Sequence, residues 1–148
     1  MNKLLPILVS ILLLLSINAR AKTSKEYALM SAEVWSAFSC SVLASKSKNK
    51  DEQERLFKYG YKHGLIFINA INSGKVNQED ISSNTPIGVA FLLQGPTADF
   101  MLGRIYEYAS DEALKEVYKS NGKYNSEDIQ TSIATNEFLK RNCKLIGR

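Results

Sequence analysis

The spacing of apolar residues constrains the fold of this chain more than any other feature of its sequence. Between residues 24 and 44, apolar side chains recur at intervals of seven or four residues: Tyr27, Val34, Phe38 and Val42. Polar residues such as Glu33 and Ser36 fall on the opposite side of the same segment. A period near 3.6 residues is typical of an amphipathic α-helix and not of a strand. We therefore expect a first long helix over this segment.

The segment from about residue 51 to residue 72 is apolar around most of its circumference. Its polar positions fall in one narrow wedge, formed by Arg55, Lys58, Lys62 and Asn69. A helix of this kind is usually surrounded by other elements, so we expect it at the centre of the fold. Gly60 and Gly64 lie one turn apart, and the expected reason is close crossing of a neighbouring helix, with a ligand groove as the alternative.

A further helical pattern follows Gly95 and Pro96 and places Met101, Leu102 and Ile105 on one face. An unbroken continuation would bring two glutamates, Glu112 and Glu116, onto that face. We therefore predict that this helix breaks near Ser110, which would cap a following helix that carries Leu114, Val117 and Tyr118.

The rest of the chain completes an all-α pattern. Residues 87 to 94 have no clear period and could form a buried helix or a strand, and residues 119 to 126 have the composition of a turn. A last helix, from about residue 126 to residue 145, should present one apolar side: Ile129, Leu139, Cys143 and Ile146. The sequence thus predicts a single-domain helical bundle of about five helices.

The first 21 residues have the features of a secretory signal peptide. Lys3 precedes an apolar run from Leu4 to Leu15, and Ala19, Arg20 and Ala21 form a small-x-small cleavage pattern. Cleavage after Ala21 would leave a domain of residues 22–148 without a membrane anchor, in the periplasm or secreted. The alternative is an uncleaved anchor, but the run is short for a membrane span of about 20 residues.

The charge of the expected mature domain is close to balanced. Of the 19 lysine and arginine residues, Lys3 and Arg20 belong to the predicted signal, which leaves 17 basic against 15 acidic residues and a net charge of +2. The charged run at residues 45–55 contains no aromatic residue, so we interpret it as a solvated connection. These features argue against a nucleic-acid partner.

Cys40 and Cys143 are the two cysteines of the chain. In an exported protein such a pair favours a disulfide, and two separate buried thiols are the alternative. Together with the single histidine, His63, the cysteines supply too few ligands for a typical zinc site. We therefore expect no metal, and in the absence of a glycine-rich phosphate loop we expect no cofactor.

Candidate catalytic residues are sparse. His63 falls on the apolar face of its segment, near Tyr59 and Phe67, so we interpret it as a core histidine. The serines lie in neither a G-x-S-x-G nor an S-x-x-K motif. Acidic residues on a helix usually form a solvated face, and the alternative is that Asp99 or Glu107 serves as acid or base in a small hydrolase of cell-wall or glycan substrates.

Phe100 falls on the face of its helix that should be polar, next to Gly103, Arg104 and Tyr108. If the helix lies between two layers, Phe100 belongs to the core and Gly103 lets a neighbour approach. Otherwise these four residues are a candidate partner surface, because exposed aromatic and arginine side chains are enriched at binding hot spots.

The layout of a signal peptide, a small helical domain and one distant cysteine pair is similar in outline to small periplasmic immunity proteins that neutralise type VI secretion amidases. It is similar also to other small periplasmic inhibitors and chaperones. This resemblance covers the architecture and no residue-level motif. The lack of catalytic motifs and the expected disulfide-linked helical fold favour a non-enzymatic protein that binds another protein, as an inhibitor, immunity or accessory factor. The alternative is the small hydrolase.

Overall fold

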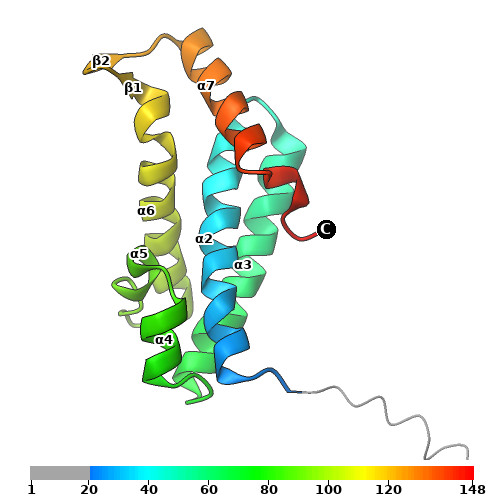
Figure 1. Ribbon diagram of the computed structural model, residues 1–148, viewed down its shortest axis with the longest axis vertical. Helices are drawn as coiled ribbons and strands as arrows, with labels where there is room; N and C mark the ends of the chain where they lie inside the picture. Colours follow the sequence, from blue (N-terminus) through cyan, green and yellow to red (C-terminus); the bar gives the residue numbers. More distant parts are fainter. Residues whose placement is uncertain (1–20) are drawn as a thin grey trace, which may run out of the picture.

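The computed structural model describes residues 21–148, and within them the chain forms a bundle of six α-helices (Figure 1). The helices are α2 (Ser24–Lys46), α3 (Lys50–Asn72), α4 (Gln78–Asn84), α5 (Ile87–Ala90), α6 (Ala98–Tyr118) and α7 (Glu127–Lys140). Two short antiparallel strands, β1 (Lys119–Ser120) and β2 (Lys123–Tyr124), and a 3-10 helix, η1 (Cys143–Leu145), complete the fold. The predicted all-α bundle is confirmed. The predicted signal peptide lies outside the described residues except for Ala21.

Polar side chains fix where the long helices begin. At the start of α2, the Thr23 hydroxyl accepts a hydrogen bond from the Glu26 amide, and the Glu26 carboxylate accepts one from the Thr23 amide. This capping box satisfies two backbone donors that a helix end otherwise leaves free. Asn49 caps α3 and Thr97 caps α6 in the simpler one-sided way. Only residues 47–49 of the charged run at 45–55 connect two helices, because residues 45–46 belong to α2 and residues 50–55 belong to α3.

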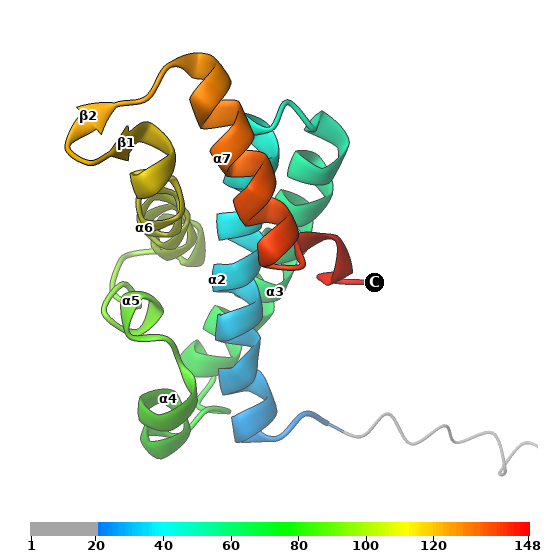
Figure 2. The same ribbon diagram turned by 45° about the horizontal axis from the view of Figure 1, so that its top comes forward.

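The central helix is α2, and the prediction that the second long helix is central was wrong. Helices α3, α6, α7 and α4 all pack on α2, and Figure 2 shows α7 lying across it. Small side chains explain this position, because buried Ala, Ser and Cys residues let neighbouring helices approach closely. The buried Ser41 hydroxyl is satisfied by the Gln53 carbonyl at 2.9 Å. In α3, by contrast, Phe57 and Tyr61 are 40% and 38% exposed.

The two glycines of α3 lie where neighbouring side chains fill the space. A Cβ atom on Gly60 would lie 2.8 Å from the Phe38 ring, and one on Gly64 would lie 2.3 Å from a Leu102 methyl carbon. Close packing against α2 and α6 therefore accounts for both glycines.

Helix α6 runs unbroken through Ser110, so the predicted break is wrong. Four of its buried residues, spaced four apart, form a stripe: Ile105, Ala109, Ala113 and Val117. Each step of four residues moves the stripe by about 40° around the helix, because one turn takes 3.6 residues. The buried stripe thus winds from the lower core, around Phe38 and Phe67, to the upper core, around Leu43 and Phe138. Glu112 and Glu116 fall outside this winding stripe and are exposed.

The predicted last helix ends earlier than expected. Helix α7 stops at Lys140, and Asn142 adopts a left-handed conformation with φ 53° before η1 begins. Ala134 and Phe138 are the buried residues of α7, whereas Ile129 and Leu139, which we expected on the apolar side, are 49% and 57% exposed.

A disulfide joins Cys40 in α2 to Cys143 in η1, as predicted, with the two Cα atoms 5.6 Å apart. Both cysteines are buried in the upper core. Arg55 of α3 holds the chain beyond the disulfide, because its guanidinium donates hydrogen bonds to the carbonyls of Ile146 and Cys143. The C-terminal segment is therefore fastened beside α3 (Figure 1).

Candidate functional site

Helix α6 has two flanks that face different neighbours, and the four residues of the candidate partner surface are divided between them. Arg104 contacts the chain that follows α5, and Tyr108 contacts Gly88 of α5 itself. Gly103 lines a groove on the opposite flank, together with residues of α3. The sequence placed these residues on one outer face because it could not show which neighbour lies against each flank.

The first flank forms what we call the α5–α6 surface: Ile87, Phe91, Phe100, Arg104 and Tyr108. Ile87 and Phe91 are 73% and 71% exposed, and Phe100 and Tyr108 are 50% and 44% exposed. Phe100 is therefore not a core residue. Of the two explanations for its position, the structure supports the exposed one.

Local packing holds the α5–α6 surface in place. Gly88 lies so close to Tyr108 that a Cβ atom would be 2.8 Å from its ring, and Tyr108 in turn packs edge-on against Trp35, with ring centroids 5.7 Å apart. Arg104 donates a hydrogen bond of 2.8 Å to the Gln94 carbonyl, and its guanidinium lies 5.8 Å from the centroid of the Phe100 ring. These contacts limit the rotamers of Arg104 and Tyr108.

The second flank forms the α3–α6 groove, with a volume of about 300 Å³, lined by Phe38, Phe57, Tyr61, Asp99, Leu102, Gly103 and Tyr106. Phe38 belongs to α2, so three helices contribute to the groove. At its rim, the Tyr61 hydroxyl of α3 donates a 2.5 Å hydrogen bond to the Asp99 carboxylate of α6. Sequence reasoning missed this groove because its residues come from separate segments. The only signal was the aromatic pair Phe57 and Tyr61, one helical turn apart.

Asp99 and Glu107 are not brought together across a cleft. Asp99 lines the α3–α6 groove, whereas Glu107 lines a separate shallow hollow with Arg104, Tyr108 and Asp111. Glycoside hydrolysis requires two carboxyl groups on opposite sides of the scissile bond. This pair therefore does not form the site that the hydrolase alternative requires.

A third cluster joins α2 to α3 around the Glu33 carboxylate. Glu33 accepts a 2.9 Å hydrogen bond from the Tyr59 hydroxyl, and His63 Nδ1 lies 3.0 Å from the same oxygen. The rings of Tyr59 and His63 stack with centroids 4.0 Å apart. The interpretation of His63 as a core histidine is therefore wrong: its side chain is 24% exposed, because this edge of α3 faces the polar edge of α2.

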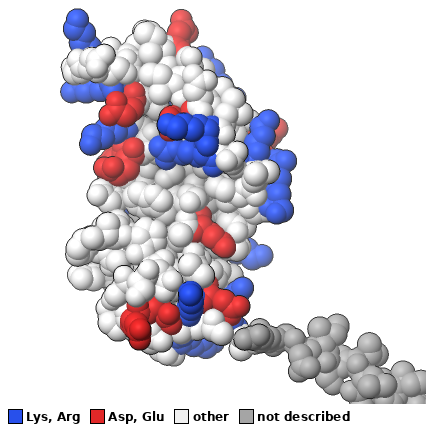
Figure 3. All heavy atoms as spheres, in the orientation of Figure 1, with Lys and Arg blue, Asp and Glu red and all other residues white. Residues whose placement is uncertain are grey.

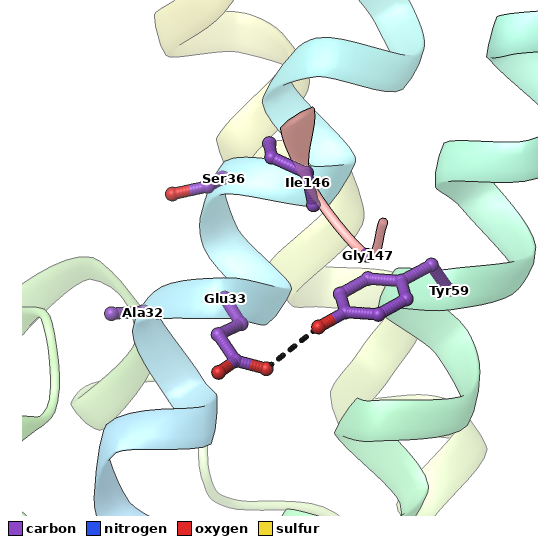
Figure 4. A pocket seen from close by; sticks show the side chains of 6 residues that line it. All are labelled: Ala32, Glu33, Ser36, Tyr59, Ile146 and Gly147. Atoms are coloured by element: carbon purple, nitrogen blue, oxygen red, sulfur yellow. Dashed lines mark hydrogen bonds between the residues drawn. The ribbon is translucent and has the colours of Figure 1, made fainter. Parts of the chain in front are cut away.

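Figure 4 shows the shallow hollow next to this cluster, with a volume of about 370 Å³, lined by Ala32, Glu33, Ser36, Tyr59, Ile146 and Gly147. The Tyr59 hydroxyl points to Glu33, whereas the Ser36 hydroxyl points away from both. Ser36 is therefore not arranged as a nucleophile activated by this cluster. Gly147 lies against the Tyr59 ring, so the C-terminal segment forms one wall of the hollow.

Tyr59 should ionise at unusually high pH. Partial burial, followed by the hydrogen bond to Glu33, raises the pKa of Tyr59 to about 12. Because this pKa lies above the unfolded value of 10.0, the associated stability is fully present below pH 10 and is lost as the pH rises towards 12. An alkaline titration of phenolate absorbance, followed while circular dichroism shows intact helices, should lose its most alkaline step in Tyr59→Phe. The control Tyr124→Phe should keep that step, and identical curves for Tyr59→Phe and wild type would contradict the assignment.

Residues 21–148 contain no group of three or more His, Cys, Asp and Glu side chains placed to hold a metal ion. Helix α2 alone among the described helices is long and apolar enough to cross a membrane, but 67% of the relevant segment is buried inside the bundle, as in the core helix of a globular domain.

No protein-family model, curated protein or solved structure matches the chain.

Proposed function

We propose that this protein is an exported, non-enzymatic binding protein that acts on another protein as an inhibitor, immunity or accessory factor. One observation carries the proposal: four large apolar side chains of the α5–α6 surface are between 44% and 73% exposed. Single exposed apolar residues need no explanation, but an exposed apolar patch marks a site of interaction. These four residues come from two helices that contact each other, α5 with its C-terminal cap and α6.

The composition and setting of this surface support a protein partner. Aromatic residues and arginine are enriched at protein interfaces, where a few of them supply most of the binding energy. Figure 3 shows that uncharged side chains cover the area of α5, with lysine, arginine and acidic side chains above and below it. The contacts of Arg104 and Tyr108 order their side chains in advance, which lowers the entropic cost of binding.

The compartment is part of the proposal. The signal-like N-terminus predicts export, and a buried disulfide is suited to an oxidising compartment. We propose that the mature protein begins at Lys22, works in the periplasm or outside the cell, and needs neither a cofactor nor a membrane anchor.

The test is affinity capture with immobilised residues 22–148 and periplasmic extract, quantified by mass spectrometry. We expect Phe91→Ala and Phe100→Ala each to reduce capture of one protein by about tenfold, because truncation of a hot-spot aromatic typically costs more than 1 kcal/mol of binding energy. Phe91 is 71% exposed and Phe100 is 50% exposed, so the melting temperature should change little in either variant.

The matched controls are Tyr124→Ala and Leu139→Ala, which remove apolar side chains that are 79% and 57% exposed at other places on the bundle. These two variants should capture the same protein as well as wild type. If the surface variants and the controls retain every protein equally, the α5–α6 surface is not the partner site.

A further inference from the structure

The α3–α6 groove has a chemistry that the α5–α6 surface lacks. Four aromatic rings and Leu102 line it, and Asp99 is the one charged residue among the described residues that do so. We propose that this groove binds a small organic cation, an alkylammonium ion with a short apolar stem. This proposal does not depend on the proposed function.

The aromatic rings of the groove stand in two orientations. Phe57 and Tyr61 are stacked, with 17° between their planes and 6.2 Å between their centroids. Tyr106 stands at 88° to Phe57, and Phe38 at the base of the groove stands at 89° to Tyr106. The groove is therefore lined by aromatic rings in both orientations, and cations are attracted to the π face of an aromatic ring by its quadrupole.

Asp99 supplies the charge complementarity. Its Oδ1 atom accepts the hydrogen bond from the Tyr61 hydroxyl, which crosses from α3 to α6 at the rim. Within residues 21–148, no lysine, arginine or histidine forms an ion pair with Asp99. The carboxylate is therefore a negative charge at the edge of an apolar groove, without a cation of the chain itself to neutralise it.

The size of the groove favours a short ligand. Its volume of about 300 Å³ is at the lower end of small-molecule sites, which range from roughly 300 to 1,000 Å³. Gly103 adds room in the α6 wall, because no atom lies within 4 Å of the position of a Cβ on this residue. A cationic head beside Asp99, with a stem of a few carbon atoms along Phe57 and Tyr106, matches both the charge and the volume.

The experiment is an NMR titration of residues 22–148 with three probes that share a butyl stem: n-butylammonium, 1-butanol and pentanoate. We expect n-butylammonium to shift the ring resonances of Phe57, Tyr61 and Tyr106. Butanol should bind about threefold to tenfold more weakly, and pentanoate more weakly still, since an exposed cation–π contact and an exposed ion pair are each modest. Equal affinity for the three probes, or no binding of n-butylammonium, would overturn the proposal.

Two variants and one control assign the binding to named residues. Asp99→Asn should weaken n-butylammonium about threefold to tenfold and leave butanol unchanged, whereas Gly103→Leu should weaken both probes by filling the groove. The control Glu107→Gln removes a carboxylate from the other flank of α6 and should bind like wild type. If Asp99→Asn and Glu107→Gln behave alike, the charge of Asp99 does not select the ligand.

A fourth probe separates a free ligand from a side chain of a protein partner. The capped tripeptide acetyl-Gly-Lys-Gly-amide carries the same ammonium head on a peptide backbone. We expect it to bind more weakly than n-butylammonium, because the groove is small. Tighter binding of the peptide would overturn the assignment to a free cation.

Discussion

Replacement of both Cys40 and Cys143 by alanine should lower the free energy of unfolding by about 4 to 5 kcal/mol. The disulfide joins residues 103 positions apart, and a closed loop of this length strongly restricts the unfolded chain. Domains of this size are typically stable by only about 5 to 15 kcal/mol, so the loss is a large part of the total. Urea denaturation of residues 22–148, followed by circular dichroism, measures it.

The same experiment has an internal control. Wild-type protein unfolded with a reductant present should have the same urea midpoint as the double variant, because both lack the covalent link. Removal of the link should also loosen the C-terminal segment, which is then held mainly by Arg55, and amide exchange near Ile146 should increase. An unchanged midpoint in both reduced and substituted protein would show that the disulfide does not stabilise the fold.

The second large effect is expected at Phe38. Phe38→Ala should lower the free energy of unfolding by about 3 to 5 kcal/mol, because the ring is 1% exposed at the centre of the bundle. It packs edge-on against Tyr106 and lies against the backbone of Gly60, so no neighbour can fill the space that truncation leaves. Urea denaturation is again the measurement.

Phe100→Ala is the matched control for Phe38→Ala. The same substitution at a ring that is 50% exposed should cost less than about 1 kcal/mol. A similar loss at both positions would show that Phe100 is part of the core, and the α5–α6 surface would no longer be a candidate partner site.

The sequence predicted the helical elements well where one face of a helix meets one core. The first long helix, the second long helix and the start of α6 near Pro96 all follow from period and local signals. Prediction failed at Ser110 because it assumed a stripe on one fixed side, whereas α6 passes from one core cluster to the other and its buried stripe winds with it.

The candidate site could be predicted only in part. The unusual position of Phe100 was visible in the sequence, because this aromatic residue interrupts a polar face. The structure shows that its ring is half-exposed. The α3–α6 groove was not visible, because Phe38, Tyr61 and Asp99 come from three helices and become neighbours only through packing. His63 was misplaced for the same reason: its partner Glu33 lies on another helix.

The amino-acid sequence by itself determined the helical class and, with only two cysteines, which pair could form a disulfide. These properties are local or combinatorial, whereas the packing of the helices brought the two cysteines close enough to bond. The tertiary structure alone decided which helix is central and which flanks of α6 stay open. Helical period states which side chains share a face, but the distance at which helices pack depends on side-chain size at each crossing. The small residues of α2 therefore made it the centre, whereas α3 keeps its charged side chains on an exposed face and packs on α2 from outside.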